Sequence, residues 1–345
     1  MLPTDVKDRT PFFLSRNAGF ASATAADDLL HPQANRTVEG DSLTETQYFG
    51  FNVPHAALHG YMYCWHHPNL KVVSGGVWSW RGIKRESLAC ELFDQRLFMS
   101  DALLANDLHS YRLDNGYSVE ILEPLQRHRV RYSDPARGNS IELEYEALMP
   151  PVMFANGKHF EQAMKVKGAV TLRGKRFDVD SYNIRDRSWA KLRPEDPYAI
   201  PPVAWHTGAF NDRFIFNCTA SDHPDVDPDW KSLFPDFPSD RVLNAGWIYR
   251  DGELSAVVDC RKRTVRDRSN LYPHSIHMIL TDERGRQLNI NGQVVAACMM
   301  SNWWNIRGVV CLTRWQCEGH TGYGDTQEPQ WNDYVYHRLA GSQET

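Results

Sequence analysis

The sequence predicts an all-β protein with two β-domains. From residue 46 onward, short runs of alternating apolar and polar residues are separated by turn signals at intervals of about ten residues, as in β-sandwiches and barrels. The alternation of strands and helices that is typical of a parallel α/β sheet does not occur. A proline-rich break at residues 190–202 divides the β region into halves of similar length.

We therefore expect three parts along the chain. They are an N-terminal arm at residues 1–45, a first β-domain at 46–195 and a second at 196–345. The arm is rich in Asp, Thr, Ala and Pro and is weakly patterned, with one short helix expected at 23–31.

Hairpin signals define the strands of the first β half. In residues 108–122, Asn115-Gly116 supplies the positive φ that a tight hairpin turn requires. Residues 128–149 predict a second hairpin with a longer Pro/Gly loop, and 160–189 predict two long strands around Gly174. In the second half, strands are expected within residues 210–218, 244–260, 275–295 and 308–324.

Charge and composition exclude several classes of partner. The 345 residues carry a net charge of −5, with a pI of about 6.3, so no basic surface for nucleic acid is indicated. No run approaches the roughly 18 apolar residues of a membrane-spanning helix, and the N-terminus lacks the pattern of a secretory signal. The seven Cys include no Cys-x-x-Cys pair, which favours buried thiols in a reducing cytoplasm. The sequence does not fix the oligomeric state, and a homodimer is one arrangement that it allows.

Aromatic residues cluster on one predicted strand face. His59, Tyr61, Tyr63 and Trp65 alternate along the strand and therefore share a face, while the neighbouring His66 lies on the other. This spacing is poor for paired metal ligands, so we expect no metal site. The face fits either a ligand surface or a packed cross-strand aromatic ladder.

A second aromatic pair follows in the next predicted strand. Trp78 and Trp80 again share a face, and core packing is the alternative to ligand binding. Gly75-Gly76, just before them, allows a bulge or a close approach of another backbone.

The segment Ser181–Trp189 carries charge where a core strand normally carries Val or Ile. Tyr182 and Asp186 share one face, while Arg185, Arg187 and Trp189 share the other. Burial would raise the pKa of an Asp carboxyl, and a nearby Arg would lower it. Asp186 is therefore either a proton donor or part of an ion-pair network that ties strands together.

Known cofactor motifs do not occur in the chain. There is no G-x-G-x-x-G after a strand, no P-loop, no G-x-S-x-G and no H-E-x-x-H, so we expect no cofactor. Trp303 and Trp304 are adjacent and lie on opposite strand faces, so that one can pack inward while the other covers a surface between domains.

Two stretches of the chain resemble a known family, the AttH-like group. They are residues 51–82, with the pattern FNVP, Y-x-W-x-HPN and GGVWSWRG, and residues 185–189, which read RDRSW. That group is related to the hydroxyneurosporene synthases, which are carotenoid 1,2-hydratases, and its fold is similar to that of some fungal Diels–Alderases. The resemblance implies two lipocalin-like (calycin-type) antiparallel β-barrel domains packed together, with an apolar interior and no organic cofactor. It also implies an Asp proton donor near Tyr, Trp and His, for which the nearest matches are Asp186, Tyr182, His59, Tyr63 and Trp65.

The hypothesis is a cofactor-independent lyase or isomerase (a hydratase, dehydratase or cyclase) that acts by acid catalysis on a hydrophobic isoprenoid, terpenoid or polycyclic substrate. The predicted catalytic residues are Asp186, Tyr182 and His59. The predicted substrate-binding residues are Tyr61, Tyr63, Trp65, Trp78, Trp80, Arg185, Arg187, Trp189, Trp303 and Trp304. Two alternatives stay open: a carrier for a hydrophobic small molecule, and a structural protein whose aromatic faces are plain core.

Overall fold

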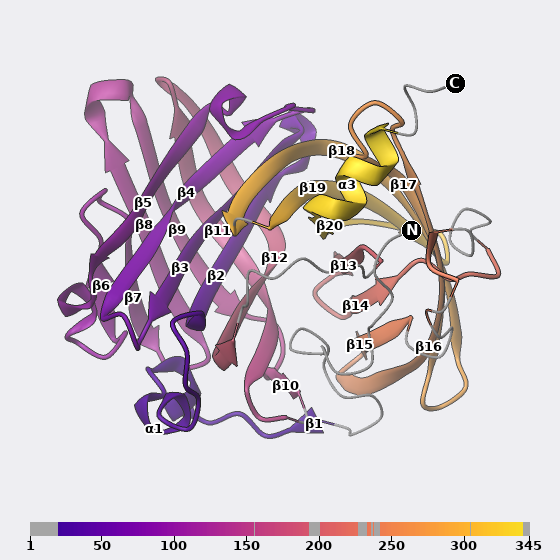
Figure 1. Ribbon diagram of the computed structural model, residues 1–345, viewed down its shortest axis with the longest axis horizontal. Helices are drawn as coiled ribbons and strands as arrows, with labels where there is room; N and C mark the ends of the chain where they lie inside the picture. Colours follow the sequence, from indigo (N-terminus) through magenta and orange to yellow (C-terminus); the bar gives the residue numbers. More distant parts are fainter. Residues whose placement is uncertain are drawn as a thin grey trace. The chain divides into compact units, whose positions relative to one another are not determined.

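The computed structural model describes residues 20–154, 156–192, 201–226, 233–235, 237, 242–303 and 305–340 (Figure 1). The chain forms two compact β units. The described part of the first unit is 20–81 and 88–192, and that of the second is 82–87 and 201–340. The all-β class with lipocalin-like units is confirmed.

The first unit is built almost entirely of antiparallel strands. Its elements are β1 (Phe20–Ala21), η1 (Ala25–Asp28), α1 (Pro32–Asn35), β2 (Leu43–Val53), η2 (Pro54–Ala56), β3 (Leu58–His67), β4 (Val72–Arg81), η3 (Ser87–Ala89), β5 (Leu92–Ser100), η4 (Asp101–Leu104), β6 (Ser110–Arg112), β7 (Ser118–Glu123), β8 (Arg127–Asp134), η5 (Pro135–Arg137), β9 (Asn139–Ala147), β10 (Val152–Phe154), β11 (His159–Leu172) and β12 (Lys175–Leu192).

These strands form one curled sheet that stays open. Its main order is β5-β4-β3-β2-β12-β11-β9-β8-β7-β6, so β5 and β6 are the edges of this order; off it, β10 pairs with β11 and β1 pairs with β10. At the β5 edge the pairing with β4 is irregular between Val73 and Gly75, and Phe98 adopts a left-handed φ of 53°. The ladder is therefore interrupted by a bulge on the edge strand.

The predicted hairpins of the first unit are confirmed. β6 and β7 pair around the Asn115-Gly116 turn, where Gly116 has a φ of 87°. The Asn115 amide then donates to the backbone carbonyls of Gly75 and Asp94 at 3.4 and 3.3 Å, so the turn also contacts β4 and β5. β8–β9 and β11–β12 are the other two predicted hairpins.

The interior of the curled sheet holds the apolar core. It includes Phe49 and Phe51 of β2, Met62 of β3, Val77 of β4 and Val166 of β11, all buried. Because side chains alternate along a strand, the intervening residues of these strands point to the opposite side of the sheet.

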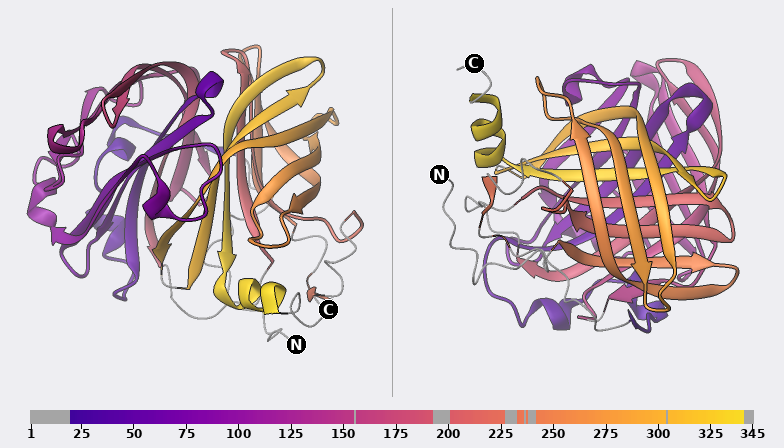
Figure 2. Two further views of the ribbon diagram at one scale, coloured as in Figure 1. Left: turned by 90° about the horizontal axis from the view of Figure 1, so that it is seen from above. Right: turned by 90° about the vertical axis from the view of Figure 1, so that its right-hand side faces the viewer.

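The second unit contains a closed antiparallel barrel in the order β13-β14-β15-β16-β17-β18-β19-β20, with β20 pairing back to β13. Figure 2 shows β16 to β19 side by side in this barrel. Its elements are β13 (Val203–Asn211), β14 (Phe214–Ser221), β15 (Leu243–Arg250), β16 (Glu253–Arg266), β17 (Pro273–Asp282), β18 (Gln287–Trp303), β19 (Ile306–Cys317), β20 (His320–Trp331) and α3 (Asn332–Ala340).

The barrel interior combines an apolar core with a charged end. Trp315 is fully buried there, and its indole N–H donates to the Thr207 carbonyl at 2.7 Å. At the charged end, Arg266 donates to Asp222 at 2.7 Å and to both Glu328 oxygens at 2.8 Å. The buried carboxylates of Asp222 and Glu328 thus have the Arg266 charge beside them, which offsets the cost of removing them from water.

The structure adds two features that the strand pattern did not predict. The helix α3 follows β20, and its Tyr334 is buried. In addition, residues 82–87, which lie between β4 and β5 in the sequence, belong to the second unit. The Ala297 N–H donates to the Gly82 carbonyl at 3.0 Å, and the Lys84 N–H donates to the Ala297 carbonyl at 2.7 Å. The seven cysteines are all free and buried, as expected.

Among the described residues, no helix has both the length and the apolarity needed to span a bilayer.

The Gly75-Gly76 pair provides a test of the packing in the first unit. A Cβ on Gly76 would lie 2.1 Å from the Asp94 carbonyl oxygen, so we expect Gly76→Ala to destabilise the chain by about 1–3 kcal/mol in urea unfolding. Gly308→Ala is the control, because its Cβ would meet nothing closer than the Met300 carbonyl at 3.4 Å. An unchanged unfolding midpoint for Gly76→Ala would contradict the close approach of β5.

Candidate functional site

The predicted aromatic residues of β3 and β4 gather on one face of the first-unit sheet, the side away from the core. We call this the aromatic face. Register pairs Tyr61 with Trp78 and His59 with Trp80, and it places Tyr48 of β2 opposite Tyr63. The face consists of Tyr48, His59, Tyr61, Tyr63, Trp65, Trp78 and Trp80, all of which are buried.

The rings of the aromatic face contact one another in series. Tyr61 stacks on Trp78 with centroids 4.8 Å apart, and on Tyr48 at 5.4 Å. Trp65 lies 6.5 Å from Trp78 and 5.2 Å from Tyr63. These separations fall within the usual range for favourable aromatic pairs, so the face is preorganised by its own contacts.

His59 is held at one end of this face. Its ring is perpendicular to Trp80 with centroids 5.0 Å apart, and its Nδ1 lies 3.0 Å from the Phe51 carbonyl oxygen. In the tautomer with a proton on Nδ1, that nitrogen donates to the carbonyl and fixes the ring.

Asp186 borders the aromatic face. On β12 it stands opposite Tyr48 of β2 on one side and opposite Glu161 of β11 on the other. Directly opposed residues have Cβ atoms about 5 Å apart, so two residues with carboxyl side chains are neighbours at the border of the aromatic face. Asp186 is half-buried, while Glu161 is 2 % exposed.

The next row of side chains is polar as well. His159 Nε2 lies 3.4 Å from Glu161 Oε1, and the His159 ring stacks on Phe154 at 4.8 Å. Opposite His159, Ser188 shares a hydrogen bond of 2.6 Å with Thr46. An imidazole, two carboxyls and two hydroxyls therefore adjoin the rings, which is a set of groups that can give and accept protons. We call these four residues of two adjacent rows, His159, Glu161, Asp186 and Ser188, the acid–base cluster.

Tyr182 lies on the same side of the sheet as Asp186 but away from it. Four residues along a strand separate them by about 13 Å. The Tyr182 ring is half-buried beneath the Lys165 ammonium, 4.4 Å from its centroid. Tyr48 and Tyr63 stand in the same row as Asp186 and are its nearer phenols.

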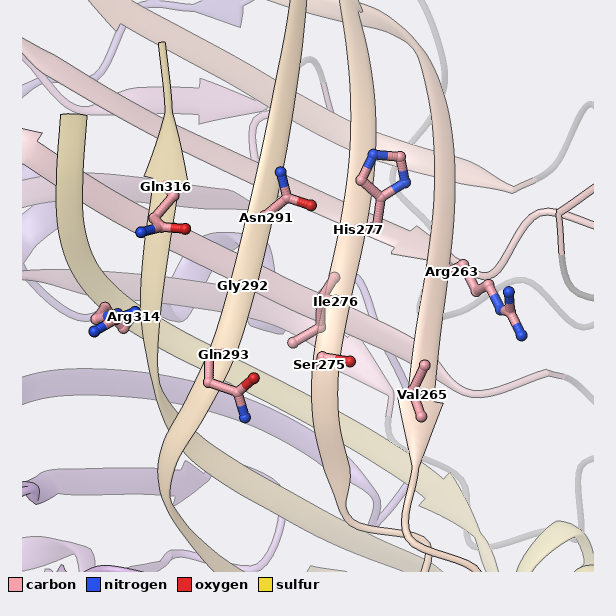
Figure 3. A pocket seen from close by; sticks show the side chains of 10 residues that line it. All are labelled: Arg263, Val265, Ser275, Ile276, His277, Asn291, Gly292, Gln293, Arg314 and Gln316. Carbon is pink, nitrogen blue, oxygen red and sulfur yellow. The ribbon is translucent and has the colours of Figure 1, made fainter. Parts of the chain in front are cut away.

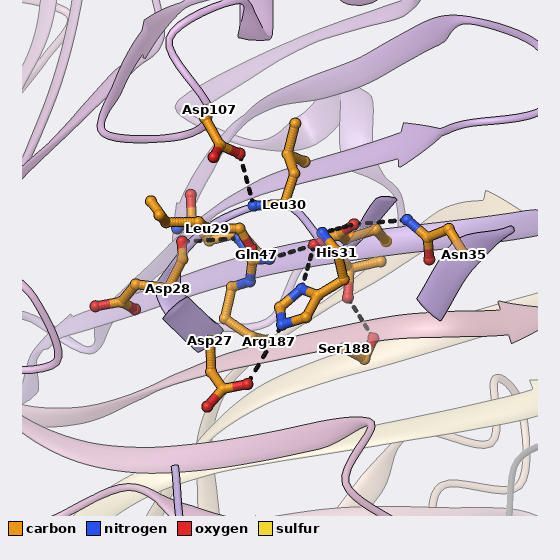
Figure 4. Close-up of polar contacts among 12 residues, drawn as sticks. Asp27, Asp28, Leu29, Leu30, His31, Asn35, Gln47, Asp107, Arg187 and Ser188 are labelled. Atoms are coloured by element: carbon orange, nitrogen blue, oxygen red, sulfur yellow. Dashed lines mark hydrogen bonds and ion pairs between the residues drawn. The ribbon is translucent and has the colours of Figure 1, made fainter. Parts of the chain in front are cut away.

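Arg185, Arg187 and Trp189 lie on the opposite side of the sheet from Asp186, as alternation requires. Both arginines are buried and bind the N-terminal segment that contains η1 and α1, and Figure 4 shows Arg187 there. Arg185 donates to Asp28 at 2.6 Å and to Gln162 at 2.8 Å. Arg185 and Arg187 thus form ion pairs that tie β12 to Asp28 and to Glu45 of β2, whereas Asp186 lies on the other side of the sheet.

Arg187 and Trp189 complete this attachment. Arg187 donates to Glu45 at 2.5 Å and to the Leu29 carbonyl at 2.7 Å. The Trp189 indole stacks face to face on His31, with centroids 3.7 Å apart. His31 Nδ1 in turn lies 2.9 Å from Glu45 Oε1. We call Ala25–Asn35, which includes η1 and α1, the N-terminal plug.

The buried network shifts the pKa values of its members. Burial acts to raise the pKa of Asp28, but the Arg185 charge and the His128 hydrogen bond outweigh it and hold that pKa well below its usual range. Burial also opposes ionisation of Glu45, yet the His31 hydrogen bond and the Arg187 charge lower its pKa. For His128, burial and the nearby Arg185 lower the pKa to about 4, so its imidazole is neutral at pH 7.

Two predicted site residues, Trp303 and Trp304, lie at the end of β18 and just beyond it. Trp303 ends β18, and its side chain, like the whole of Trp304, lies outside the described residues. Within the described part of the chain, no group of three or more His, Cys, Asp or Glu is placed to hold a metal ion.

Sequence reasoning missed Glu161, His159 and Tyr48. The signal for Glu161 was present, because Arg173-Gly174 was identified as the turn between two long strands. In a hairpin, residues at equal distances before and after the turn stand opposite each other. Counting from Arg173-Gly174 in this way places Glu161 opposite Asp186. Tyr48 needs the long-range pairing of β2 with β12, which no local pattern contains.

Solved structures of other proteins have the same fold as this chain. An AttH candidate from Nitrosomonas europaea superposes with a TM-score of 0.60 at 13% identity, covering 91% of this chain and 99% of the other. CghA gives 0.58 at 11% identity, covering 93% and 97%. Kievitone hydratase from Nectria haematococca gives 0.50 at 10% identity, covering 94% and 99%. The resemblance to the AttH-like group is thus confirmed in the fold.

Residues 24–334 match the model of the family described as a domain of unknown function, DUF7064, and the chain belongs to that family. No protein with a curated description matches the chain in sequence.

Removing one partner from the buried network should be costly. In Asp28→Asn, the Arg185 guanidinium keeps its charge but loses its counter-charge, so we expect a loss of about 3–5 kcal/mol in the free energy of unfolding, measured with urea. Asp178→Asn is the control, because its ion pair with Arg176 is exposed and should contribute less than about 1 kcal/mol. Equal stabilities of the two variants would contradict this role of Asp28.

The lowered pKa of His128 predicts a pH dependence of stability. Between its ordinary value of 6.5 and its folded value of about 4, the unfolded chain binds a proton at this position and the folded chain does not. The free energy of unfolding should therefore fall as the pH drops through this window. His128 contributes to the slope of that fall the uptake of at most one proton on unfolding.

In His128→Gln this part of the slope should vanish, as measured by urea unfolding between pH 4 and 7. His109→Gln, at an exposed position, should keep it. If both variants follow the wild-type slope, the contribution of His128 is disproved.

Proposed function

We propose that this protein is a cofactor-independent lyase or isomerase, of the hydratase, dehydratase or cyclase type, for a hydrophobic isoprenoid, terpenoid or polycyclic substrate. The observation that carries the proposal is the position of Asp186. It stands between the buried aromatic face and a second carboxyl, Glu161. Rings that can hold an apolar molecule thus adjoin groups that can move a proton.

The proposed mechanism begins with Asp186 in its acid form. It gives a proton to an alkene carbon or to an oxygen leaving group, which creates a carbocation. Tyr63, Tyr48 and Trp65, in the same row as Asp186 or the next, attract this cation through their ring faces, at about 1–2 kcal/mol per well-placed ring.

The fate of the cation decides the product. When water adds to it, Glu161 accepts the proton that the water loses, and hydration results. When a neighbouring C–H bond gives up its proton to Glu161, an alkene forms, as in a dehydration. When an internal double bond attacks the cation, a ring closes. His159, 3.4 Å from Glu161, can take the proton onward.

The comparisons support this type of reaction without fixing the substrate. One of the proteins with this fold is named a hydratase, so the fold accommodates hydration in that protein. The arginines of the same strand have a structural role, since Arg185 and Arg187 are occupied by the N-terminal plug.

The first experiment is native mass spectrometry of the chain purified from its own host, followed by extraction of any bound molecule. A bound apolar compound identifies the substrate class, and incubation with that compound measures turnover. Asp186→Asn should abolish turnover and leave the free energy of unfolding within about 1 kcal/mol of wild type. Asp178→Asn, an exposed carboxyl on the same strand, should keep full activity. Wild-type rates in Asp186→Asn would disprove the proposed acid.

A carrier function is the second candidate. The stacked rings of the aromatic face could hold an apolar molecule without any chemistry, since ring contacts alone provide the surface. The two functions differ in the fate of the ligand: an enzyme returns it changed, and a carrier returns it intact. In a carrier, Asp186→Asn would also leave ligand affinity unchanged.

A further inference from the structure

The barrel of the second unit has a polar groove on its outer surface, far in sequence from the acid–base cluster. The groove has a volume of about 550 Å³ and lies over β16, β17, β18 and β19 (Figure 3). Its polar lining consists mainly of Arg263, His277, Asn291, Gln293, Arg314 and Gln316.

The register of the strands orders these side chains into two adjacent rows. Arg263 stands opposite His277, His277 opposite Asn291, and Asn291 opposite Gln316. In the next row, Gln293 stands opposite Arg314. The two arginines therefore lie at the two sides of the groove with amide side chains between them (Figure 3).

The arginines of the groove differ from the other arginines on the barrel strands. Four of those have partners in the structure: Arg250 with Glu318, Arg261 with Asp225, Arg266 with Asp222 and Glu328, and Arg307 with Gln330 and the Asn270 carbonyl. Within the described part of the barrel, the side chains of Arg263 and Arg314 have neither an ion pair nor a hydrogen bond, and both line the same groove.

The groove also lacks negative charge of its own. No Asp or Glu is among its lining residues, although the chain as a whole carries a net charge of −5. His277 Nε2 lies 3.0 Å from the Asn289 side-chain oxygen, and the Gln293 amide donates to the His274 carbonyl at 3.1 Å. These contacts hold two of the central side chains in place.

We propose that this groove is a binding site for a small molecule that carries two oxyanion groups, one bound by Arg263 and the other by Arg314. The two residues are three strand spacings apart, about 14 Å across the sheet, and they are also offset by two residues, about 7 Å, along it. One compact anion is too small to contact both guanidinium groups when the two side chains extend straight out from the sheet. Guanidinium groups bind carboxylates and phosphates in a planar, two-pronged geometry. The amides of Asn291, Gln293 and Gln316 contact the polar or neutral middle of the ligand.

The site does not depend on the proposed lyase activity, because it lies on another unit and uses other residues. A molecule bound there is a second ligand beside any substrate at the aromatic face. Its oxyanions could be carboxylates or phosphates, which share the same recognition by Arg.

Isothermal titration calorimetry on the full chain at an ionic strength of about 0.02 M, where screening is weak, tests the site. The probes are sebacate, a long dicarboxylate, tripolyphosphate, and inorganic phosphate as a compact anion. We expect saturable binding of sebacate or tripolyphosphate, and weaker binding of inorganic phosphate. Sebacate alone would identify a dicarboxylate site, and tripolyphosphate alone a polyphosphate site.

Variants assign the binding to the groove. Arg263→Gln and Arg314→Gln should each weaken the tighter probe about tenfold, the loss expected for one charge-assisted interaction. Arg261→Gln is the matched control: it removes a charge from the same strand at a position already paired with Asp225, and affinity should stay within about twofold. Far-ultraviolet circular dichroism checks that each variant is folded.

Three results would overturn the proposal. They are the absence of saturable binding by any probe, wild-type affinity in the variant that carries both Arg263→Gln and Arg314→Gln, and equal affinity for inorganic phosphate and the two longer probes. The last result would show that one arginine acts alone.

Discussion

Two buried arginine–carboxylate pairs fasten the first unit together. Arg185 and Arg187 extend from β12, the longest strand of that unit, and bind Asp28 and Glu45 inside the curled sheet. Charges in such a position are stable only in each other's presence, because each would be costly to bury alone. The N-terminal plug therefore has one favourable position, in which carboxylate and guanidinium meet, whereas apolar contacts alone would allow it to slide. The sheet remains open between its edge strands, and the plug fills part of its interior with polar contacts.

The two-residue period of β12 separates support from chemistry. Arg185 and Arg187 face inward to the plug, and Asp186 between them faces the aromatic side. A strand with this alternation can be anchored firmly on one side while it presents a carboxyl on the other. The inner network therefore fixes the backbone from which Asp186 projects, without contacting the rings beside it. This explains why a segment that reads as Arg-Asp-Arg occurs in the middle of a sheet.

Local sequence patterns were sufficient for part of this structure. The Asn115-Gly116 turn and the shared face of His59, Tyr61 and Tyr63 follow from turn chemistry and strand period alone. Asp28 could not be recognised as the partner of Arg185, because 157 residues separate them and only the folded sheet brings them together. The segment around Asp28 was expected to form a short helix, and η1 is one, but its role depends on charges elsewhere. Likewise, whether a sheet closes depends on the pairing of its first and last strands, which a short window of sequence does not contain.

The interrupted edge of the first sheet has a consequence for the behaviour of the protein in concentrated solution. Among the described residues, no strand pairs with the outer side of β5, so the N–H and C=O groups of that side are open to a neighbouring chain, which exposed apolar residues such as Leu97 would attract. The left-handed backbone at Phe98 disrupts the regular spacing of these groups, so an incoming strand cannot continue the ladder past it. We therefore expect the bulge to hinder edge-to-edge association at β5, the longer of the two edge strands. The barrel of the second unit is closed and has no edge strand, so another chain cannot extend it in this way.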